Sequence, residues 1–264
     1  MPTLLSATDK STCETVLSID WWTDSLFCLT ITRPPAYRFI PGQFSRLGLA
    51  EVPSGAPVVW RAYSVTSHSD AETLEYYGIT VPGGAFTGAV AQLQPGDPIL
   101  LDKQPNGFMT IDRFTGGESL WMLATGTGLG PFIAILRERT VWTRFRDLIV
   151  VHCVRHATEL AYRSALEALG DAAANDPLAA RLHLIQSVTR EADGPGWLHG
   201  RITTLLDDGT LESAAGVPLV PESARIMLCG NPAMIDDTRR RLQQRGFLPC
   251  RRANSGHFLT ENYW

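Results

Sequence analysis

The sequence has no excess of positive charge and no long apolar run. Its 264 residues carry a formal net charge of −4, which argues against a general role in binding nucleic acid. No stretch approaches the roughly 20 consecutive apolar residues that a membrane helix needs. The N-terminus lacks a basic region followed by an apolar segment, so we expect no signal peptide. These absences predict a cytoplasmic protein without a membrane or nucleic-acid partner.

Cysteine pairs are missing as well. Five cysteines are scattered along the chain and none forms a C-x-x-C pair, which argues against a zinc site or an iron–sulfur cluster. Their odd number fits reduced thiols. With 44% hydrophobic and 19% charged residues, the chain is composed like a packed protein of one large domain or two ordinary ones. We expect no metal centre, and we expect a monomer.

The first hundred residues contain a series of short strand-like segments. They alternate in polarity or are rich in Val, Ile, Thr and aromatic residues, and Pro- and Gly-containing turns separate them. The predicted strands are residues 13–19, 26–32, 44–49, 58–64, 74–81 and 99–101. Six such strands predict an antiparallel β-barrel. Residues 87–93 are expected to form a helix over one open end.

Strands and helices alternate after about residue 115. The predicted strands are residues 120–124, 148–154, 182–188 and 224–229, and the predicted helices are residues 131–142, 160–169, 202–206 and 232–245. This alternation predicts a parallel sheet with helices on both faces. The fold class is therefore α+β in two domains, a six-stranded barrel over residues 1–114 and an α/β nucleotide-binding domain over residues 115–264. Ligands of open parallel sheets bind at the carboxyl ends of the strands.

The most informative stretch is Arg61-Ala62-Tyr63-Ser64, at the end of a predicted strand. Arg61 offers a fork of donors suited to a phosphate, and Tyr63 offers a flat face for a ring system. Ser64 offers a small donor for a ring nitrogen, on the opposite face of the strand. A flavin needs these three contacts. The same residues fit an edge strand with a surface Arg and a half-buried Tyr equally well.

A glycine-rich loop, Thr125-Gly126-Thr127-Gly128-Leu129-Gly130-Pro131, follows the strand at 120–124. Its glycines allow close approach of the backbone to a ligand, and Pro131 suits the first position of a helix. The loop is expected to meet an anion such as a pyrophosphate. Its spacing is G-x-G-x-G and departs from the usual G-x-G-x-x-G dinucleotide fingerprint. The alternative is a tight connection with no ligand.

Three arginines follow the next elements of this domain. Arg155 and Arg190 come at the ends of two predicted strands, and Arg201 begins a short helix. Together they favour the 2′-phosphate of NADP over NAD, although each alone also fits a solvated surface charge. Cys229-Gly230-Asn231-Pro232 ends the fourth strand, with Asn231 suited to cap the following helix. Its thiol is placed for a nicotinamide, or is simply buried.

The order of these motifs resembles that of bacterial-type ferredoxin/flavodoxin–NADP reductases. R-A-Y-S, the glycine run A-T-G-T-G-L-G-P, C-G-N-P and a terminal aromatic pair follow one another, and W-T-D at 22–24 and P-G-Q-F at 41–44 extend the likeness over nearly the whole chain. The resemblance implies that the barrel binds FAD and that the α/β domain binds NADPH or NADP+. It also implies that the C-terminal tail returns to the flavin.

The resemblance assigns roles residue by residue. It implies FAD contacts from Arg61, Ala62, Tyr63, Ser64, Tyr77, Thr80, Val81, Gly84, Phe86, Thr87, Thr125 and Trp264. It implies NADP contacts from Thr127, Gly128, Arg155, Arg190, Arg201, Cys229 and Asn231. Ser64 is expected near N5 of the flavin, Cys229 beside the nicotinamide, and Tyr263 near the flavin. Glu261 matches a carboxylate proposed for proton delivery. Plant-type relatives end at a Tyr, whereas Trp264 follows Tyr263 here.

The resemblance implies an enzyme in which NADPH passes a hydride to FAD and the flavin passes single electrons to a ferredoxin or flavodoxin. These acidic carriers need a basic docking face, for which the candidates are Arg46, Lys103, Arg113, Arg251 and Arg252. One alternative is an NAD(P)H-dependent reductase of free flavin or of another redox protein. Another is a flavin-binding redox sensor without enzyme activity, which would hold FAD but not turn over NADPH.

Overall fold

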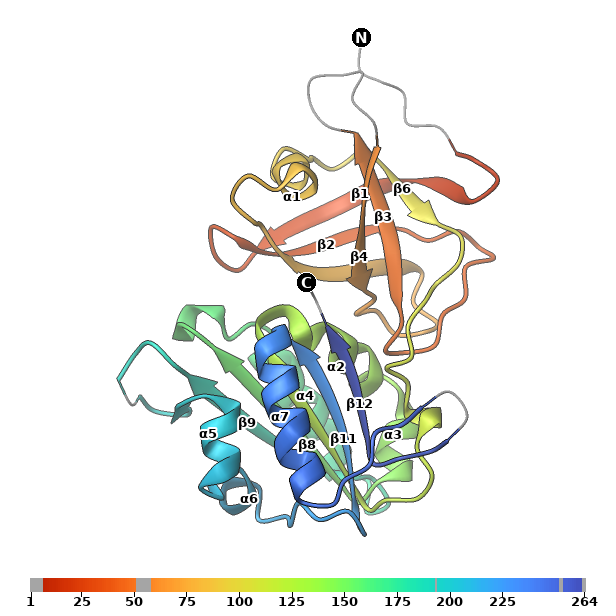
Figure 1. Cartoon of the computed structure of the whole chain (residues 1–264). Coiled ribbons are helices and arrows are strands. Elements are labelled where there is room, and N and C mark those ends of the chain that lie inside the picture. Colours follow the sequence, from red (N-terminus) through yellow and green to blue (C-terminus); the bar gives the residue numbers. More distant parts are fainter. Residues whose placement is uncertain (1–6, 51–57, 193, 252–253, 263–264) are drawn as a thin grey trace. The chain divides into compact units, whose positions relative to one another are not determined.

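The computed structural model describes residues 7–50, 58–192, 194–251 and 254–262. The chain divides into two compact units, Met1–Gly107 and Phe108–Trp264, which we call the barrel unit and the sheet unit (Figure 1). The segment that leads to the first strand of the sheet unit holds only a short 3-10 helix, η1 (Ile111–Arg113). The functional boundary at about residue 115 stays a prediction.

The barrel unit is a six-stranded antiparallel sheet that curls on itself (Figure 1). Its strands are β1 (Ser11–Trp21), β2 (Leu26–Thr32), β3 (Phe44–Ala50), β4 (Val58–Ser64), β5 (Thr73–Ile79) and β6 (Pro98–Asp102). Their order is β4-β3-β6-β1-β2-β5. An isolated bridge between Val65 and Tyr76 joins the end of β4 to β5, the two outer strands. The predicted six-stranded antiparallel fold is confirmed.

The core of the barrel unit comes from alternate residues of its strands. Phe27 and Tyr76 are fully buried, and helix α1 (Ala85–Val90) adds Phe86. Burying a side chain of this size stabilises the fold by roughly 1.5–3 kcal/mol. Three hydroxyls inside the core are paired with one another: the Tyr76 hydroxyl donates to Ser45 Oγ at 3.1 Å, and Ser45 Oγ lies 2.6 Å from the Tyr37 hydroxyl. Strand register is thus fixed by both burial and hydrogen bonds.

The sheet unit is built on a six-stranded parallel sheet. Its strands are β7 (Ser119–Thr125), β8 (Asp147–Val154), β9 (Arg181–Val188), β10 (Leu198–His199), β11 (Ala224–Gly230) and β12 (Phe258–Asn262), in the order β10-β9-β8-β7-β11-β12. Every residue of β8 and β11 is buried. This is expected where helices cover both faces of a parallel sheet.

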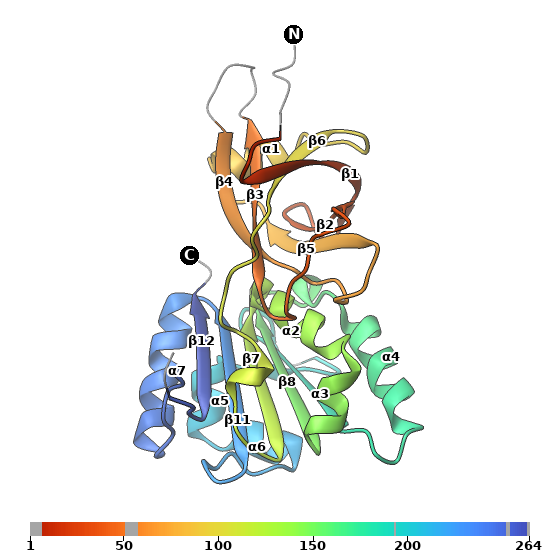
Figure 2. The ribbon, with the colours of Figure 1, turned by 90° about the vertical axis from the view of Figure 1, so that its right-hand side faces the viewer.

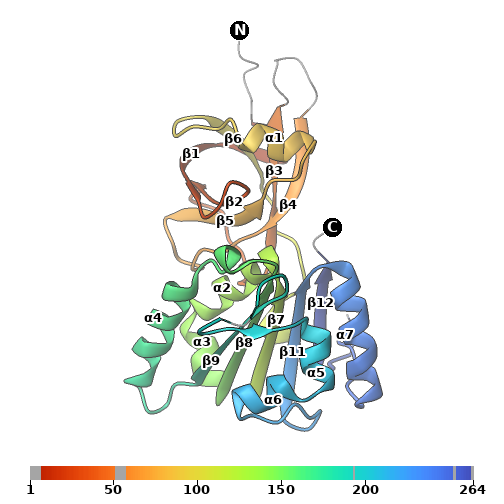
Figure 3. The same ribbon diagram turned by 90° about the vertical axis from the view of Figure 1, so that its left-hand side faces the viewer.

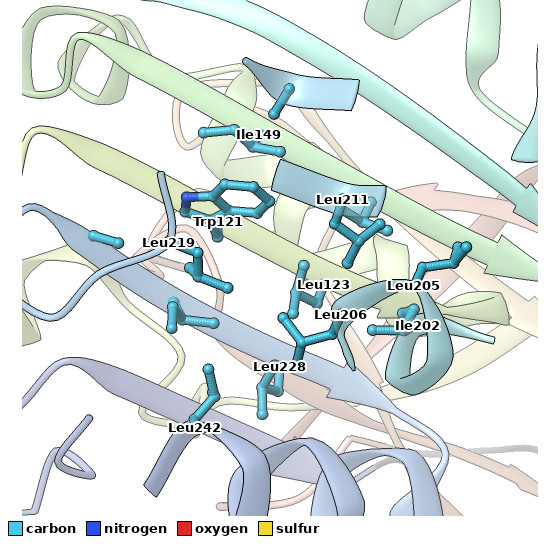
Figure 4. Packing of buried hydrophobic residues seen from close by; sticks show 14 of the residues in the cluster. Trp121, Leu123, Ile149, Ile202, Leu205, Leu206, Leu211, Leu219, Leu228 and Leu242 are labelled. Carbon is cyan, nitrogen blue, oxygen red and sulfur yellow. The ribbon is translucent and has the colours of Figure 1, made fainter. Parts of the chain in front are cut away.

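Helices cover the two faces of this sheet in separate groups. α2 (Gly130–Leu136), α3 (Arg139–Arg144) and α4 (Arg163–Ala174) lie on one face, and α5 (Ile202–Asp207), α6 (Thr210–Ala215) and α7 (Pro232–Gln244) lie on the other (Figures 2 and 3). Figure 4 shows Trp121 and Leu123 of β7 packed with leucines of the second group. In the part of the chain that is described, no helix combines the length and the apolar character that crossing a membrane requires.

Several predicted elements differ from those observed. The single helix predicted at 131–142 is two helices, because Glu138 is extended (φ −90°, ψ 132°) and the buried Trp142 indole donates to the Leu136 carbonyl at 2.8 Å. The helix predicted from residue 160 begins at Arg163, after Tyr162 in the left-handed region (φ 61°). β5 ends at Ile79, so Val81 lies in the following turn. The strand β12 and helix α6 were not predicted.

Candidate functional site

Arg61 and Ala62 are exposed near the end of β4. One amino group of Arg61, Nη1, donates to the carbonyl of Trp60 at 2.8 Å. Arg61 has other guanidinium donors besides Nη1, and this planar group favours a bidentate contact with a phosphate. A surface Arg fits both the phosphate contact and the plain edge strand, so the phosphate contact of Arg61 stays a prediction.

Tyr63 points into the barrel unit. It is 8% exposed, and its ring centroid lies 5.5 Å from that of Phe86 and 6.3 Å from that of Phe27. Burial raises the pKa of the Tyr63 phenol, so the hydroxyl stays protonated at neutral pH. The ring is held by packing on these neighbours, and stacking on a flavin stays a prediction.

Ser64 carries a buried hydroxyl that is not satisfied within the described residues. The residue is 1% exposed, and its Oγ has no hydrogen-bond partner there. A buried polar group without a partner costs about 1–3 kcal/mol. Most such groups in folded proteins are paired, so an exception is often a position that meets a ligand.

A turn after β5 brings together three more of the predicted FAD contacts, Val81, Gly84 and Thr87. The Val81 amide donates to Thr87 Oγ1 at 3.0 Å, and the Gly84 amide donates to the Val81 carbonyl at 2.9 Å. A Cβ atom on Gly84 would lie 2.6 Å from Thr87 Oγ1. The turn is therefore tight and needs glycine at residue 84. Thr80 begins this turn, whereas Phe86 and Tyr77 are buried in the barrel unit.

In the sheet unit, the strand order changes direction between β7 and β11. The chain passes from β7 to β8 on one side and later returns to β11 on the other. Loops that leave neighbouring strands in opposite directions open a crevice at the carboxyl edge, and ligands of this architecture bind there. The glycine loop follows β7, and Gly230-Asn231 follows β11. The two predicted motifs thus meet at this edge.

The two loops touch with no space for side chains. A Cβ atom on Gly128 would collide with the Cys229 carbonyl, and one on Gly230 (φ 130°) would collide with Thr125. The Asn231 amide donates to Thr125 Oγ1 at 2.8 Å. The glycines are therefore required by the close approach of the two loops. Gly126–Leu129 forms a 3-10 turn (η2), and Thr127 within it is buried.

Cys229 is wholly buried on β11. Burial, followed by the nearby Glu261 charge, raises the pKa of its thiol well above the usual range. The thiol is neutral and unsuited to nucleophilic attack. Glu261 on β12 lies opposite Cys229 in the parallel register. The side-chain oxygen of Asn231 caps α7 by accepting hydrogen bonds from the backbone amides of Ala233 and Met234. The side-chain nitrogen Nδ2 of Asn231 is left for a ligand.

The three predicted arginines are all exposed at the carboxyl edge of the sheet. The Arg190 amide donates to the Arg155 carbonyl at 3.0 Å, which joins the ends of β8 and β9. Arg201 begins α5, and the Ser187 hydroxyl donates to the carbonyl of the preceding Gly200. These bonds place the three side chains on neighbouring turns of one edge.

Two glutamates hold the turn that follows Arg155. Glu159 accepts from the Arg155 amide at 2.9 Å. Glu191 accepts from the Ala157 amide at 3.0 Å and lies 3.1 Å from His156 Nδ1. Among the described residues, neither carboxylate forms an ion pair with Arg155, Arg190 or Arg201.

His152 was missed by the sequence analysis. It lies in β8 after the apolar run Leu148–Val151, fully buried, with Nε2 3.0 Å from the Gly126 carbonyl of the glycine loop. A lone histidine within L-I-V-V-H-C-V was the only signal for it. The predicted roles of Tyr263 and Trp264 cannot be compared, because both residues lie outside the described residues.

Known proteins match this chain over nearly its full length. The family model for the oxidoreductase NAD-binding domain matches residues 122–240. Ferredoxin–NADP reductase A of Sorangium cellulosum (strain So ce56) is 40% identical over 251 residues, covering 94% of this chain and 88% of that protein. The flavodoxin/ferredoxin–NADP reductase of Escherichia coli (strain K12) is 38% identical over 250 residues, covering 94% and 97% respectively.

A solved structure agrees with these sequence matches. The crystal structure of a ferredoxin NADP+ reductase from Neisseria gonorrhoeae with bound FAD and NADP superposes with a TM-score of 0.90 and 38% identity. The match covers 97% of this chain and 100% of that one. The likeness therefore includes both units.

Proposed function

Since this chain belongs to the family of ferredoxin and flavodoxin–NADP reductases, we propose that it is an FAD-dependent enzyme exchanging electrons between NADPH and a ferredoxin or flavodoxin. The observation that carries the proposal is the placement of three exposed arginines at the carboxyl edge that also holds the glycine loop. A 2′-phosphate is the anion that such a set distinguishes from a plain ribose. The proposal thus includes a preference for NADP over NAD.

The barrel unit offers residues that fit FAD. Ser64 Oγ is a buried hydroxyl without a partner among the described residues, and the exposed Arg61 offers a cation for the pyrophosphate. The tight turn from Val81 to Thr87 needs glycine at residue 84, which suits a close approach of phosphate. Tyr63 directly precedes Ser64 and supplies an aromatic ring beside it in sequence. We assign FAD to this unit on these grounds.

The sheet unit fits the dinucleotide substrate. Thr127 and Gly128 lie in the loop that faces the crevice, and Arg155, Arg190 and Arg201 supply positive charge at the same edge. Asn231 and the neutral thiol of Cys229 complete the end of β11. An uncharged thiol can contact a nicotinamide ring without adding to it as a nucleophile. We assign the nicotinamide end to this position.

FAD, when bound, supplies the conversion between a hydride and single electrons. The chain then contributes binding and alignment. Holding the reactants in the correct orientation lowers the activation barrier by as much as about 7–11 kcal/mol. The close contact between the loops after β7 and β11 fixes the backbone on which Thr125 and Cys229 are carried. We propose Glu261 as the proton-delivering carboxylate, since it lies beside Cys229 in the sheet.

An acidic carrier protein requires a basic surface. Arg113 donates to the Arg251 carbonyl at 2.9 Å, so these two basic residues are neighbours on the sheet unit. Lys103 and Arg46 of the barrel unit already contact the carbonyls of residues 8 and 9 and the Asp102 carboxylate respectively. Arg252 lies outside the described residues. We therefore propose Arg113 and Arg251 as the first carrier contacts.

Charge reversal tests this docking surface. Arg251→Glu is expected to slow reduction of ferredoxin or flavodoxin and to spare reduction of a small dye. Arg239→Glu on α7 is the control, because Arg239 is exposed as Arg251 is; it pairs with Asp236 of the same helix at 3.5 Å. Equal losses with both acceptors would contradict the docking role. We further propose that the protein is cytoplasmic and monomeric. Size-exclusion chromatography tests the oligomeric state.

The main experiment is anaerobic. The purified protein is loaded with FAD, its visible spectrum is recorded, and NADPH or NADH is added separately. Rapid bleaching by NADPH and slow bleaching by NADH is the expected result. Equal bleaching would indicate a less selective flavin reductase. A yellow protein that neither nucleotide bleaches would indicate a flavin-binding sensor, and failure to take up FAD would contradict the proposal.

A further inference from the structure

His152 is buried in the centre of an apolar sheet, which is a costly place for an imidazole. It lies on β8 beside Ala124 of β7 and Gln186 of β9, with no exposed surface. The rest of β8 is hydrophobic from Leu148 to Val151. A leucine would fill this layer without burying two ring nitrogens. The position of this histidine therefore calls for a polar role.

Its polar contact is with the glycine loop. Nε2 lies 3.0 Å from the carbonyl oxygen of Gly126. A carbonyl oxygen only accepts, so Nε2 carries the proton and donates. Gly126 has a positive φ of 53°, and its carbonyl is the first of the 3-10 turn Gly126–Leu129. The imidazole thus holds the point at which the chain leaves β7 and turns into the loop.

The second ring nitrogen has no hydrogen-bond partner within the described part of the chain. With Nε2 protonated in the neutral ring, Nδ1 is an acceptor that stays unpaired there. Gln186 is the direct neighbour of His152 in the β8–β9 register, but its buried amide nitrogen is unpaired too, so the two atoms do not bond to each other. Among the described residues, the contact with the Gly126 carbonyl is therefore what holds the imidazole.

We propose that His152 is a positioning residue for dinucleotide binding. Nε2–H donates to the Gly126 carbonyl, which fixes both the tautomer of the ring and the path of the glycine loop. The loop then keeps the contact of Gly128 with the carbonyl of Cys229. This inference rests on the proposed function of the loop as the NADP site.

A purely structural role makes a different prediction. If His152 only filled the sheet, its loss would lower stability without a specific effect on the loop.

Burial lowers the pKa of His152 to about 4, so the ring is neutral at physiological pH. Gln reaches as far as His and places an amide donor where Nε2 lies, whereas Leu fills similar volume without a donor. The pair of substitutions separates the donor from the packing.

The test uses the FAD-loaded full-length protein and NADP+ as the probe. His152→Leu is expected to weaken NADP+ binding about tenfold, because one buried hydrogen bond to the loop is lost. The NADP+ affinity of His152→Gln is expected to stay within about threefold of the wild-type affinity. A threefold change corresponds to less free energy than the loss of one such hydrogen bond. Hydrogen exchange of the amides of residues 126–130, without nucleotide, is expected to accelerate in His152→Leu alone. FAD content and the flavin spectrum should not change.

Ser119→Ala is the matched control. Ser119 is buried on β7, and its Oγ also lacks a partner among the described residues, but it lies at the amino end of the strand. It is expected to leave both NADP+ affinity and loop exchange unchanged. Equal NADP+ affinity and equal loop exchange in His152→Leu and the wild type would overturn the inference.

A measurement on the wild-type protein covers the case in which His152→Leu does not fold. Nitrogen-15 NMR of labelled histidine is expected to show His152 neutral, with the proton on Nε2. A proton on Nδ1 in the wild type would overturn the inference. Wild-type protein that fails to bind NADP+ would contradict the proposed function instead, while the tautomer and exchange results would still test the loop contact.

Discussion

The backbone amide of Asn231 donates to the side-chain hydroxyl of Thr125 at 2.8 Å, although 106 positions separate the two residues. This bond joins the loop after β7 to the loop after β11, at the place where the strand order changes direction. A Cβ atom added at Gly230 would collide with Thr125. The two loops therefore behave as one backbone element, and the dinucleotide site depends on their alignment.

Replacing Thr125 with Val tests this link. The variant keeps the shape but leaves the Asn231 amide without its acceptor, which costs about 1–3 kcal/mol. We expect a lower free energy of unfolding and weaker NADP+ binding, measured by urea denaturation and calorimetry. Thr125→Ser keeps the hydroxyl and is expected to behave like the wild type. Identical behaviour of the Val variant and the Ser variant would show that the bond is not important.

Gly128→Ala tests the close approach of the loops. The added Cβ would collide with the backbone carbonyl of Cys229, which cannot move as a side-chain end can. Overpacking of this kind costs about 1–3 kcal/mol, and the loop must shift away from its partner. We expect loss of NADP+ affinity in calorimetric titration. Gly88→Ala is the control, because a Cβ at Gly88 meets no atom within 4 Å. NADP+ affinity equal in the two variants would contradict the prediction.

Ser64→Ala separates ligand chemistry from stability. Ser64 Oγ is buried without a partner among the described residues, so removing it should not lower the stability of the flavin-free protein. If the hydroxyl contacts the flavin, NADPH should reduce the flavin about 10–100-fold more slowly in Ser64→Ala than in the wild type. This factor corresponds to one hydrogen bond of about 1.4–2.8 kcal/mol made at the reacting ring. Stopped-flow bleaching and thermal denaturation measure the two effects. A loss of stability with unchanged bleaching would assign Ser64 a structural role.

Much of the fold was predictable because local patterns agree with the final packing. Residues 26–32 and 44–49 read as strands, and both are strands of the barrel unit. The apolar run at 148–154 reads as a strand covered on both faces, and β8 is fully buried. Where local preference and tertiary environment point to the same state, sequence alone is sufficient.

The missed features depend on contacts between distant residues. No Gly or Pro marks the break between α2 and α3, which accompanies the bond from the Trp142 indole to the Leu136 carbonyl. β12 contains polar residues and is a strand through its pairing with β11. His152 is a single polar residue within the run L-I-V-V-H-C-V, and its hydrogen-bond partner Gly126 lies 26 positions away. Such features follow from topology rather than from local pattern.

The three arginines provide a test of nucleotide preference. Arg155→Gln, Arg190→Gln and Arg201→Gln each remove one charge-assisted contact, worth about 1.5–3 kcal/mol. We expect the KM for NADPH to rise about 10–100-fold in each variant, while the KM for NADH stays constant, as measured by dye reduction. Arg139→Gln is the control, since Arg139 is exposed on α3 and pairs with Asp176 at 3.8 Å. Parallel losses with both nucleotides would exclude a role in reading the 2′-phosphate.

The buried imidazole of His152 predicts how stability depends on pH. Burial is the main cause that lowers its pKa from 6.5 to about 4, and the Gly126 carbonyl partly opposes this shift. Between these two values the unfolded chain binds a proton that the folded chain excludes, so the free energy of unfolding falls as the pH falls from 6.5 to 4.

The loss from this group alone is about 3 kcal/mol at pH 4, and it is absent above pH 7. His152→Gln has no titrating group at this position, so its stability should decline less steeply over the same interval. Urea denaturation of the FAD-loaded protein at several pH values measures the two slopes. Equal slopes would mean that the folded protein does not exclude this proton, which would contradict a buried neutral imidazole that donates from Nε2 alone.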